Sequence, residues 1–183
     1  DRTSFESDIV AGIPDFIFGN PGYAVVAHHL HGYEPLVRSD KELLQGIIVV
    51  RIDSPYHDLK SLDKKRIAFP TPHAFAASLY LRGRMQMDAD IQYQVKYLST
   101  HDNVYRHVAA GLVDAGGGVY RTLNAESEQL KSQLKVIYET PGLPPHPLLA
   151  HPRVKKTVVN DVIKTVLALD KNLPGKIILE NVK

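Results

Sequence analysis

The sequence predicts an α/β protein with a largely parallel sheet, because strand-like and helix-like segments alternate along most of the chain. Two further observations support this class. The run Gly46-Ile-Ile-Val-Val-Arg-Ile52 has the apolar, β-branched composition of a buried strand. Two other strands, ending near Phe69 and Leu98, lead through short polar turns directly into helices.

Local signals define the N-terminal elements. Apolar residues at helical spacing over residues 5–10 predict a helix that Gly12 ends. Residues 15–18 predict a short buried strand. Pro21 suits the first turn of a helix that ends at Gly32.

The remaining elements follow from the same periodicities. In order, we expect a short strand over 36–37, the strand over 46–52, a short helix over 59–65, a strand over 66–69, a helix over 74–86, a strand over 91–98, a helix over 103–112 with Val104, Val108 and Leu112 inward, a strand over 113–117 that ends in a glycine turn, a helix over 120–133, a strand over 134–138, a long helix from Pro152 with an apolar valine stripe, and a strand over 176–182.

Composition excludes several classes of protein. The net charge is only +2, and no basic run exceeds Lys64-Lys65-Arg66, so nucleic-acid binding has little support. The absence of cysteine removes disulfides, thiolate catalysis and cysteine zinc sites. No apolar run reaches the roughly 18–20 residues of a membrane span. The chain opens at Asp1 without Met, so the missing signal peptide is no indication of a cytoplasmic protein.

An ordered series of motifs then resembles one family. The series comprises Gly12-Ile-Pro-Asp15, Phe18-Gly-Asn-Pro-Gly-Tyr23, Gly32-Tyr-Glu-Pro-Leu36, Ile48-Val-Val-Arg-Ile-Asp-Ser-Pro55, Leu59-Lys-Ser-Leu62, Lys65-Arg-Ile-Ala-Phe69, Ser99-Thr-His-Asp102, Ala109-Ala-Gly-Leu-Val-Asp-Ala115, Pro141 to Pro147 and His151-Pro-Arg153. The chain thereby resembles the PhnD-like phosphate, phosphite and phosphonate substrate-binding proteins of ABC transporters, which are type 2 periplasmic binding proteins.

The resemblance implies two α/β lobes joined by two crossings, with a small oxyanion bound between them. Lobe 1 would comprise residues 1–45 and 148–183, and lobe 2 residues 46–147. Family members have a strand, a helix and a second strand before the position of Asp1, so lobe 1 would be incomplete. We expect its unpaired edge to be completed by a partner chain, as in a homo-oligomer.

His101 is the first candidate ligand-binding residue. A helix start offers unpaired N–H groups and a positive dipole end, and an imidazole beside them suits an oxyanion. The resemblance implies that His101 contacts the phosphonate, and the alternative is a turn histidine that caps its own helix. Asp102 is more simply interpreted as the N-cap of a helix from Asn103.

Thr71, His73, Ala74 and Phe75 lie at the other helix start, where ligand contact and ordinary turn polarity remain equal alternatives. Transport members carry a Ser/Thr-rich turn here, and most of those hydroxyls are missing. The expected acidic position is Val119, which weakens the case for an amine-binding carboxylate.

Three further positions complete the candidate site. Asn20 and Tyr23 begin a helix of lobe 1, where Tyr23 either closes over a ligand or packs in the core. Gly117 lies in a glycine triplet that allows either close approach to a ligand or a tight connection. His28 and His31 share a helix face but have no further ligand nearby, so no metal or cofactor is expected.

These residues favour a non-catalytic, extracytoplasmic module that binds a small phosphonate- or phosphate-like anion for an ABC permease. No nucleophile motif or catalytic carboxylate pair supports an enzyme. The alternative is a ligand-binding sensor domain of a membrane histidine kinase or diguanylate cyclase, which the depleted hydroxyl turn favours. The sequence leaves the ligand's identity open.

Overall fold

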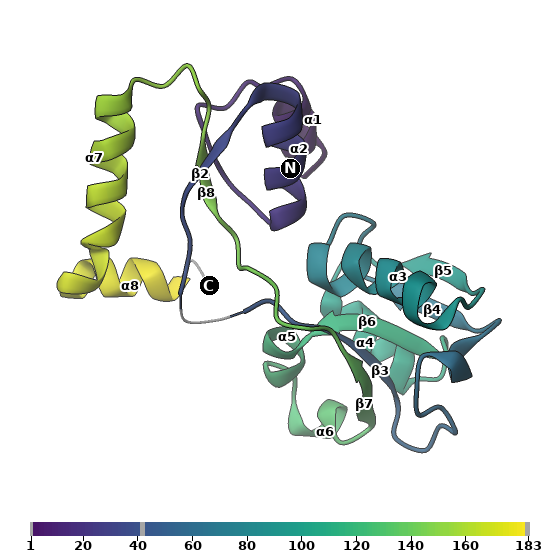
Figure 1. The fold of residues 1–183 in the computed structure, drawn as a ribbon. Coiled ribbons are helices and arrows are strands. Elements are labelled where there is room, and N and C mark those ends of the chain that lie inside the picture. Colours follow the sequence, from purple (N-terminus) through teal and green to yellow (C-terminus); the bar gives the residue numbers. More distant parts are fainter. Residues whose placement is uncertain (1, 41–42, 182–183) are drawn as a thin grey trace. The chain divides into compact units, whose positions relative to one another are not determined.

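The structure is a computed structural model that describes residues 2–40 and 43–181. The chain folds into two compact units: unit 1 comprises Asp1–Lys41 and Pro145–Lys183, and unit 2 comprises Glu42–Pro144 (Figure 1). Each unit has its own sheet and its own cluster or clusters of buried apolar side chains.

Unit 1 is built on a three-stranded sheet in the order β1-β8-β2, in which both pairings are antiparallel. Its small core contains Ile9, Ile17, Ala27, Tyr33 and Leu149. The elements are α1 (Arg2–Val10), β1 (Phe16–Phe18), α2 (Pro21–His31), β2 (Glu34–Val37), β8 (Leu148–Ala150), α7 (Lys156–Leu167), the 3-10 turn η4 (Leu169–Lys171) and α8 (Leu173–Asn181).

Helix α2 forms where its capping residues predict it. The Asn20 side chain accepts a hydrogen bond from the backbone N–H of Tyr23 at 3.1 Å, and Pro21 occupies the first turn. Gly32 ends the helix in the left-handed region at φ 71°, which glycine adopts without strain. These signals act within a few residues, so the sequence alone was sufficient to predict both helix ends.

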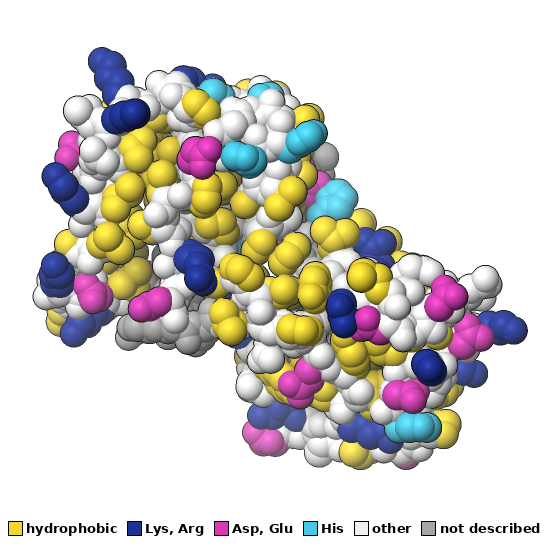
Figure 2. All heavy atoms as spheres, viewed as in Figure 1, with side chains coloured by type: hydrophobic (Ala, Val, Ile, Leu, Met, Phe, Trp, Pro, Cys, Tyr) yellow, Lys and Arg dark blue, Asp and Glu magenta, His cyan; other side chains and the backbone are white. Residues whose placement is uncertain are grey.

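The C-terminal part of unit 1 differs from the sequence predictions. Strand β8 was not predicted, and α7 begins at Lys156 instead of Pro152. The strand predicted over 176–182 is wrong, because α8 is a helix as far as Asn181; position 182 lies outside the described residues. The predicted valine stripe of α7 is only partly covered, and no residue of α7, all of which are described, is buried. Apolar side chains gather on this side of unit 1 in Figure 2.

Unit 2 carries a five-stranded sheet in the order β5-β4-β6-β3-β7. Its elements are β3 (Gly46–Arg51), the 3-10 turn η1 (Lys60–Leu62), β4 (Arg66–Phe69), the π-helix η2 (Phe75–Tyr80), α3 (Leu81–Arg84), the π-helix η3 (Met85–Ala89), β5 (Gln94–Tyr97), α4 (His101–Ala109), β6 (Ala115–Val119), α5 (Tyr120–Asn124), α6 (Glu128–Lys131) and β7 (Leu134–Glu139).

Strand β3 lies between β6 and β7 and runs opposite to both. It pairs antiparallel with both β6 and β7, while β4 pairs parallel with β5 and β6. The prediction of a largely parallel sheet is therefore wrong for unit 1, whereas in unit 2 it holds for β4, β5, β6 and β7, which all run in one direction, and fails only at β3. Alternate β3 side chains enter two different clusters, Ile48 and Val50 on one face and Ile47 and Val49 on the other. Both faces are buried, and such a run does not reveal strand direction.

The glycine triplet lies within strand β6, not in the turn predicted after it. A Cβ at Gly116 would lie 2.4 Å from Val104, at Gly117 2.3 Å from the backbone oxygen of Ala77, and at Gly118 2.2 Å from the Tyr105 hydroxyl. The triplet thus allows helical segments on both faces to approach the sheet closely.

Several helices of unit 2 are shorter or less regular than predicted. The segment predicted over 74–86 is helical but contains two π-helical stretches, and the segment over 120–133 is divided into α5 and α6. Only Lys60–Leu62 is helical within residues 59–65. Val104 and Val108 are buried as predicted, whereas Leu112 is 56% exposed because α4 ends before it.

Candidate functional site

The candidate site lies at one edge of the unit 2 sheet. Since β4 is parallel to β5 and β6, the carboxyl ends of these three strands meet at that edge. Phe69 and Tyr97 are paired at the ends of β4 and β5, and the backbone N–H of Leu98 donates to the Phe69 oxygen at 3.0 Å. The turns that follow β4 and β5 therefore leave the sheet side by side, as open α/β sheets require of a ligand site.

Helix α4 begins at this edge, two residues earlier than a cap at Asp102 would require. Thr100 is the N-cap: its hydroxyl accepts from the backbone N–H of Asn103 at 3.2 Å. The interpretation of Asp102 as the cap is wrong, because Asp102 lies inside the first turn, 3.9 Å from Arg106. Glu126 faces the same region, and burial followed by the nearby Asp102 carboxylate raises its pKa. Two acidic groups thus reduce the positive potential near this helix start.

His101 is the first residue of α4 and is half-buried. Its ring lies 6.5 Å from the ring of Tyr105, one turn further along the helix. Ser99, two residues before it, has φ 69°, and the Thr100 N–H donates to the Leu98 oxygen at 2.8 Å across a tight γ-turn. This turn aims the chain from β5 into the helix and leaves His101 at the sheet edge.

Tyr105 fixes α4 to the end of β6. Its hydroxyl lies 3.0 Å from the Val119 oxygen, 2.8 Å from the Thr122 hydroxyl and 3.2 Å from the Val119 N–H. Burial raises the pKa of Tyr105 to about 12, so the phenol stays neutral at physiological pH. The sequence did not single out Tyr105, although an aromatic residue on the inward face of a helix that follows a strand is a usable signal.

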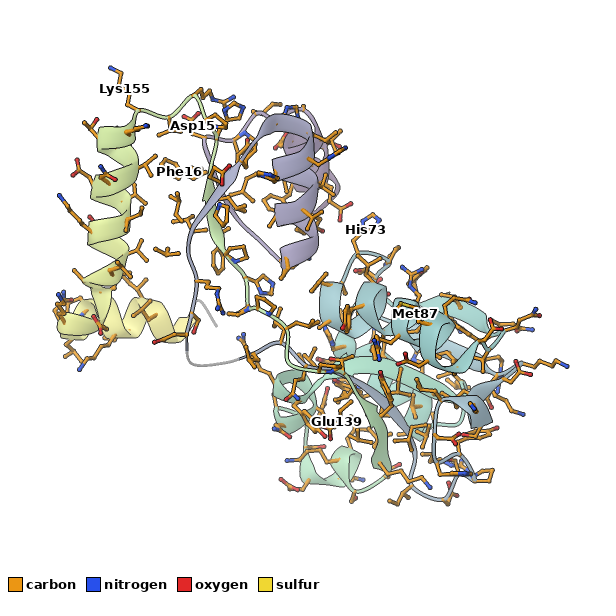
Figure 3. The ribbon with its side chains drawn as sticks, viewed as in Figure 1. Asp15, Phe16, His73, Met87, Glu139 and Lys155 are labelled. Carbon is orange, nitrogen blue, oxygen red and sulfur yellow. The ribbon has the colours of Figure 1, made fainter. Side chains whose placement is uncertain are left out.

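The turn after β4 and the start of η2 contain four of the predicted site residues, which differ in their exposure to solvent. Thr71 is partly buried, and its backbone oxygen accepts from the N–H of Ala74. Ala74 is the N-cap of η2 with no side-chain hydrogen bond, and Phe75 is the first residue of η2. His73 is exposed and points out from the loop in Figure 3. Thr71, Ala74 and Phe75 therefore lie with His101 at one edge, and His73 lies at its rim.

Two further residues, neither of which was among the predicted ligand-binding residues, border this turn. Arg82 donates from Nη2 to the Pro72 oxygen at 3.0 Å, and its guanidinium lies 6.0 Å from the ring centroid of Tyr97. Ser78 is fully buried, with its hydroxyl 3.5 Å from the same Pro72 oxygen. Arg82 brings a permanent positive charge to the edge, which only the packing of the helix over β5 reveals.

The remaining predicted residues are engaged in packing. Gly117 faces the Ala77 backbone and the Phe69 ring. Asn20 and Tyr23 belong to unit 1, where Asn20 caps α2. The Tyr23 hydroxyl donates to Glu6 at 2.6 Å, and its ring meets Phe5 edge-on at 5.5 Å.

No metal site occurs among the described residues. These residues include no group of three or more His, Asp or Glu side chains that could hold a metal ion. His28 bonds the backbone oxygen of Tyr33, and His31 bonds that of Val10, both at 2.8 Å. Within residues 2–40 and 43–181, no helix has the length and apolar character needed to cross a bilayer.

Solved structures with this fold support the two-lobed α/β class. A Xanthomonas citri protein solved with bound chloride is 17% identical, with a TM-score of 0.83 over all of this chain and 73% of its own. PhnD1 from Prochlorococcus marinus, solved with methylphosphonate, is 15% identical, with a TM-score of 0.80 over 97% of this chain and 73% of its own. A binding-protein component of a Pseudomonas aeruginosa ABC phosphonate transporter is 14% identical, with a TM-score of 0.76 over all of this chain and 65% of its own.

At these identities, the likeness shows the fold and not the ligand. A search of curated proteins found no match to the chain. The family match is more specific, because it extends over residues 1–183 and carries the description "ABC transporter, phosphonate, periplasmic substrate-binding protein". That family consists of substrate-binding proteins and not of enzymes. The chain belongs to the phosphonate-binding family of periplasmic substrate-binding proteins of ABC transporters.

Proposed function

We propose that this chain is the extracytoplasmic component of an ABC importer and binds a small, phosphonate- or phosphate-like oxyanion. The observation that carries the proposal is the meeting of two helix starts at one sheet edge. The α4 start brings His101, and the η2 start follows Thr71, which lies in the turn after the neighbouring strand β4. Backbone N–H groups at such starts bind anionic oxygens. The family match supports a permease as the partner and a location outside the cytoplasm.

The composition of the site favours a ligand different from that of hydroxyl-rich relatives. Residues 72–77 contain no serine or threonine, so Thr71 is the only hydroxyl of that turn before Ser78. Ser78 is buried and directed at Pro72. Backbone N–H groups, His101 and the Arg82 guanidinium would therefore supply most donors to the anion. The family matched is a transport family, so the sensor-domain alternative is not favoured.

Titration calorimetry tests the proposal directly. Methylphosphonate, phosphite, phosphate, sulfate and acetate would each be titrated into the wild type, His101→Ala and His57→Ala. His57 is a suitable control because it is exposed on a loop of the same unit. A charge-assisted hydrogen bond contributes about 1.5–3 kcal/mol, so we expect His101→Ala to weaken binding by roughly 10- to 100-fold. His57→Ala should bind like the wild type.

Two outcomes would contradict the proposal. The first is the absence of binding by every phosphorus oxyanion to a wild-type protein whose unfolding is cooperative. The second is an unchanged affinity in His101→Ala, which would remove the α4 start from the site.

A further inference from the structure

A second cluster of titratable side chains lies in unit 1, whereas the candidate site was built from unit 2. It comprises Asp15, His31, Tyr33, His151 and Arg153, and we call it the His–Arg cluster. The ring of His151 lies 6.4 Å from that of His31, nearly parallel to it, and 4.8 Å from that of Tyr33, edge-on. Figure 2 shows histidine side chains gathered on unit 1, and Figure 3 places Asp15 beside the turn that leads into α7.

Arg153 holds two turns of unit 1 together. Its Nε donates to Asp15 at 2.6 Å, its Nη1 to the Gly12 oxygen at 2.8 Å, and its Nη2 to the Ile13 oxygen. The backbone N–H of His151 also donates to the backbone oxygen of Asp15 at 2.9 Å. The turn between β8 and α7 is thereby tied to the turn between α1 and β1.

The position of Arg153 depends on a neutral His151. The backbone N–H of Arg153 lies 3.0 Å from Nδ1 of His151. An N–H can only donate, so Nδ1 must accept and the ring must carry its proton on Nε2. Protonation of Nδ1 would turn the acceptor into a donor facing another donor, and this hydrogen bond would be lost.

The surroundings of His151 lower its pKa, and only Asp15 acts against this. His31 approaches from α2 and Arg153 from the following turn, and both disfavour a second positive charge. Burial is the largest cause that lowers the pKa of His151, followed by Arg153 and His31, whereas Asp15 opposes them. Tyr33 adds no charge because burial raises its pKa.

Two more titratable groups lie at the same end of α2. These groups are His28 and Glu34, which lie 3.7 Å apart. His28 bonds the backbone oxygen of Tyr33 through Nδ1. Nε2 of His31 donates to the Val10 oxygen, which leaves Nδ1 as the site of a second proton.

We propose that the His–Arg cluster is an acid-sensitive latch of unit 1, closed while His151 is neutral and released when mild acid protonates it. The sign follows from linkage: when folding lowers the pKa of a histidine, the unfolded chain binds more protons near its ordinary pKa. Stability is then present above that pKa of about 6.5 and is lost as the pH falls below it. The latch is formed by residues of unit 1 alone.

Histidine NMR on the wild-type protein provides the first test. We expect Nδ1 of His151 to be unprotonated and hydrogen-bonded at pH 7.5, and His151 to titrate below the ordinary histidine pKa of about 6.5. On protonation of His151, amide exchange at Arg153 should accelerate at least tenfold beyond the change in intrinsic exchange rate. A protonated Nδ1 at pH 7.5, or a His151 that titrates at or above about 6.5, would overturn the proposal.

Thermal unfolding between pH 7.5 and 5.0 provides the second test. His151→Asn keeps an oxygen acceptor two residues before the Arg153 N–H, as in an Asx-turn, but cannot titrate. We expect the melting temperature of unit 1 to fall less with acid in His151→Asn than in the wild type. The control His29→Asn should follow the wild-type curve. Parallel curves for wild type and His151→Asn would refute the latch, even if the variant is less stable overall.

Discussion

The glycine at position 117 provides the sharpest test of how unit 2 is packed. A Cβ added there would lie 2.3 Å from the Ala77 backbone oxygen and 2.5 Å from Cδ1 of Phe69. Contacts below 3.0 Å require something to shift, and a backbone oxygen cannot rotate away as a flexible side chain can. Gly117→Ala must therefore separate β6 from the helical segment after β4.

The magnitude follows from this geometry. Overpacking of a well-packed interior costs about 1–3 kcal/mol, and a rigid backbone contact places Gly117→Ala near about 3 kcal/mol. The matched control is Gly83→Ala, because a Cβ there meets nothing within 4 Å on helix α3. Alanine should stabilise that helix by about 0.5–1 kcal/mol through its lower backbone entropy.

Thermal unfolding followed by circular dichroism measures both changes at pH 7.5. For a domain of this size, 1 kcal/mol corresponds to roughly 2–4 °C in melting temperature. Gly117→Ala should thus melt well below the wild type, and Gly83→Ala slightly above it. A Gly117→Ala protein as stable as the wild type would refute the close packing of β6 against this helix.

Three further substitutions have defined expectations. Ser99→Gly should stabilise the fold by about 0.5–1 kcal/mol in urea unfolding, because glycine adopts φ 69° without strain; a destabilised variant would argue against the γ-turn. Ala74→Ser should gain about 1 kcal/mol by supplying the missing N-cap of η2, and no change in the unfolding midpoint would mean that the hydroxyl does not reach the helix N–H groups. Tyr105→Phe should lose about 1–3 kcal/mol, because Val119 and Thr122 lose a buried partner, and a loss below about 0.5 kcal/mol would show that water replaces the phenol.

Much of the fold was predictable wherever the signal is local. The Asn20 cap and Gly32 define both ends of α2 within a few residues, and the run over 46–52 could only be a buried strand. The ordered motifs also indicated the family that the match over residues 1–183 shows. For the candidate site, the sequence predicted that turns after two strands carry its polar residues, and the parallel pairing of β4 and β5 brings those turns together.

Only the tertiary structure shows which residues meet when they are distant along the chain. The direction of β3, the close contact of Ala77 with Gly117 and the position of Arg82 over Tyr97 depend on which elements meet, and no local periodicity encodes that. The same holds for His151 and Arg153, whose partners lie near residue 15. Backbone dihedrals and caps are determined by neighbouring residues. Strand order, close backbone contacts and the charge state of a histidine are determined by packing.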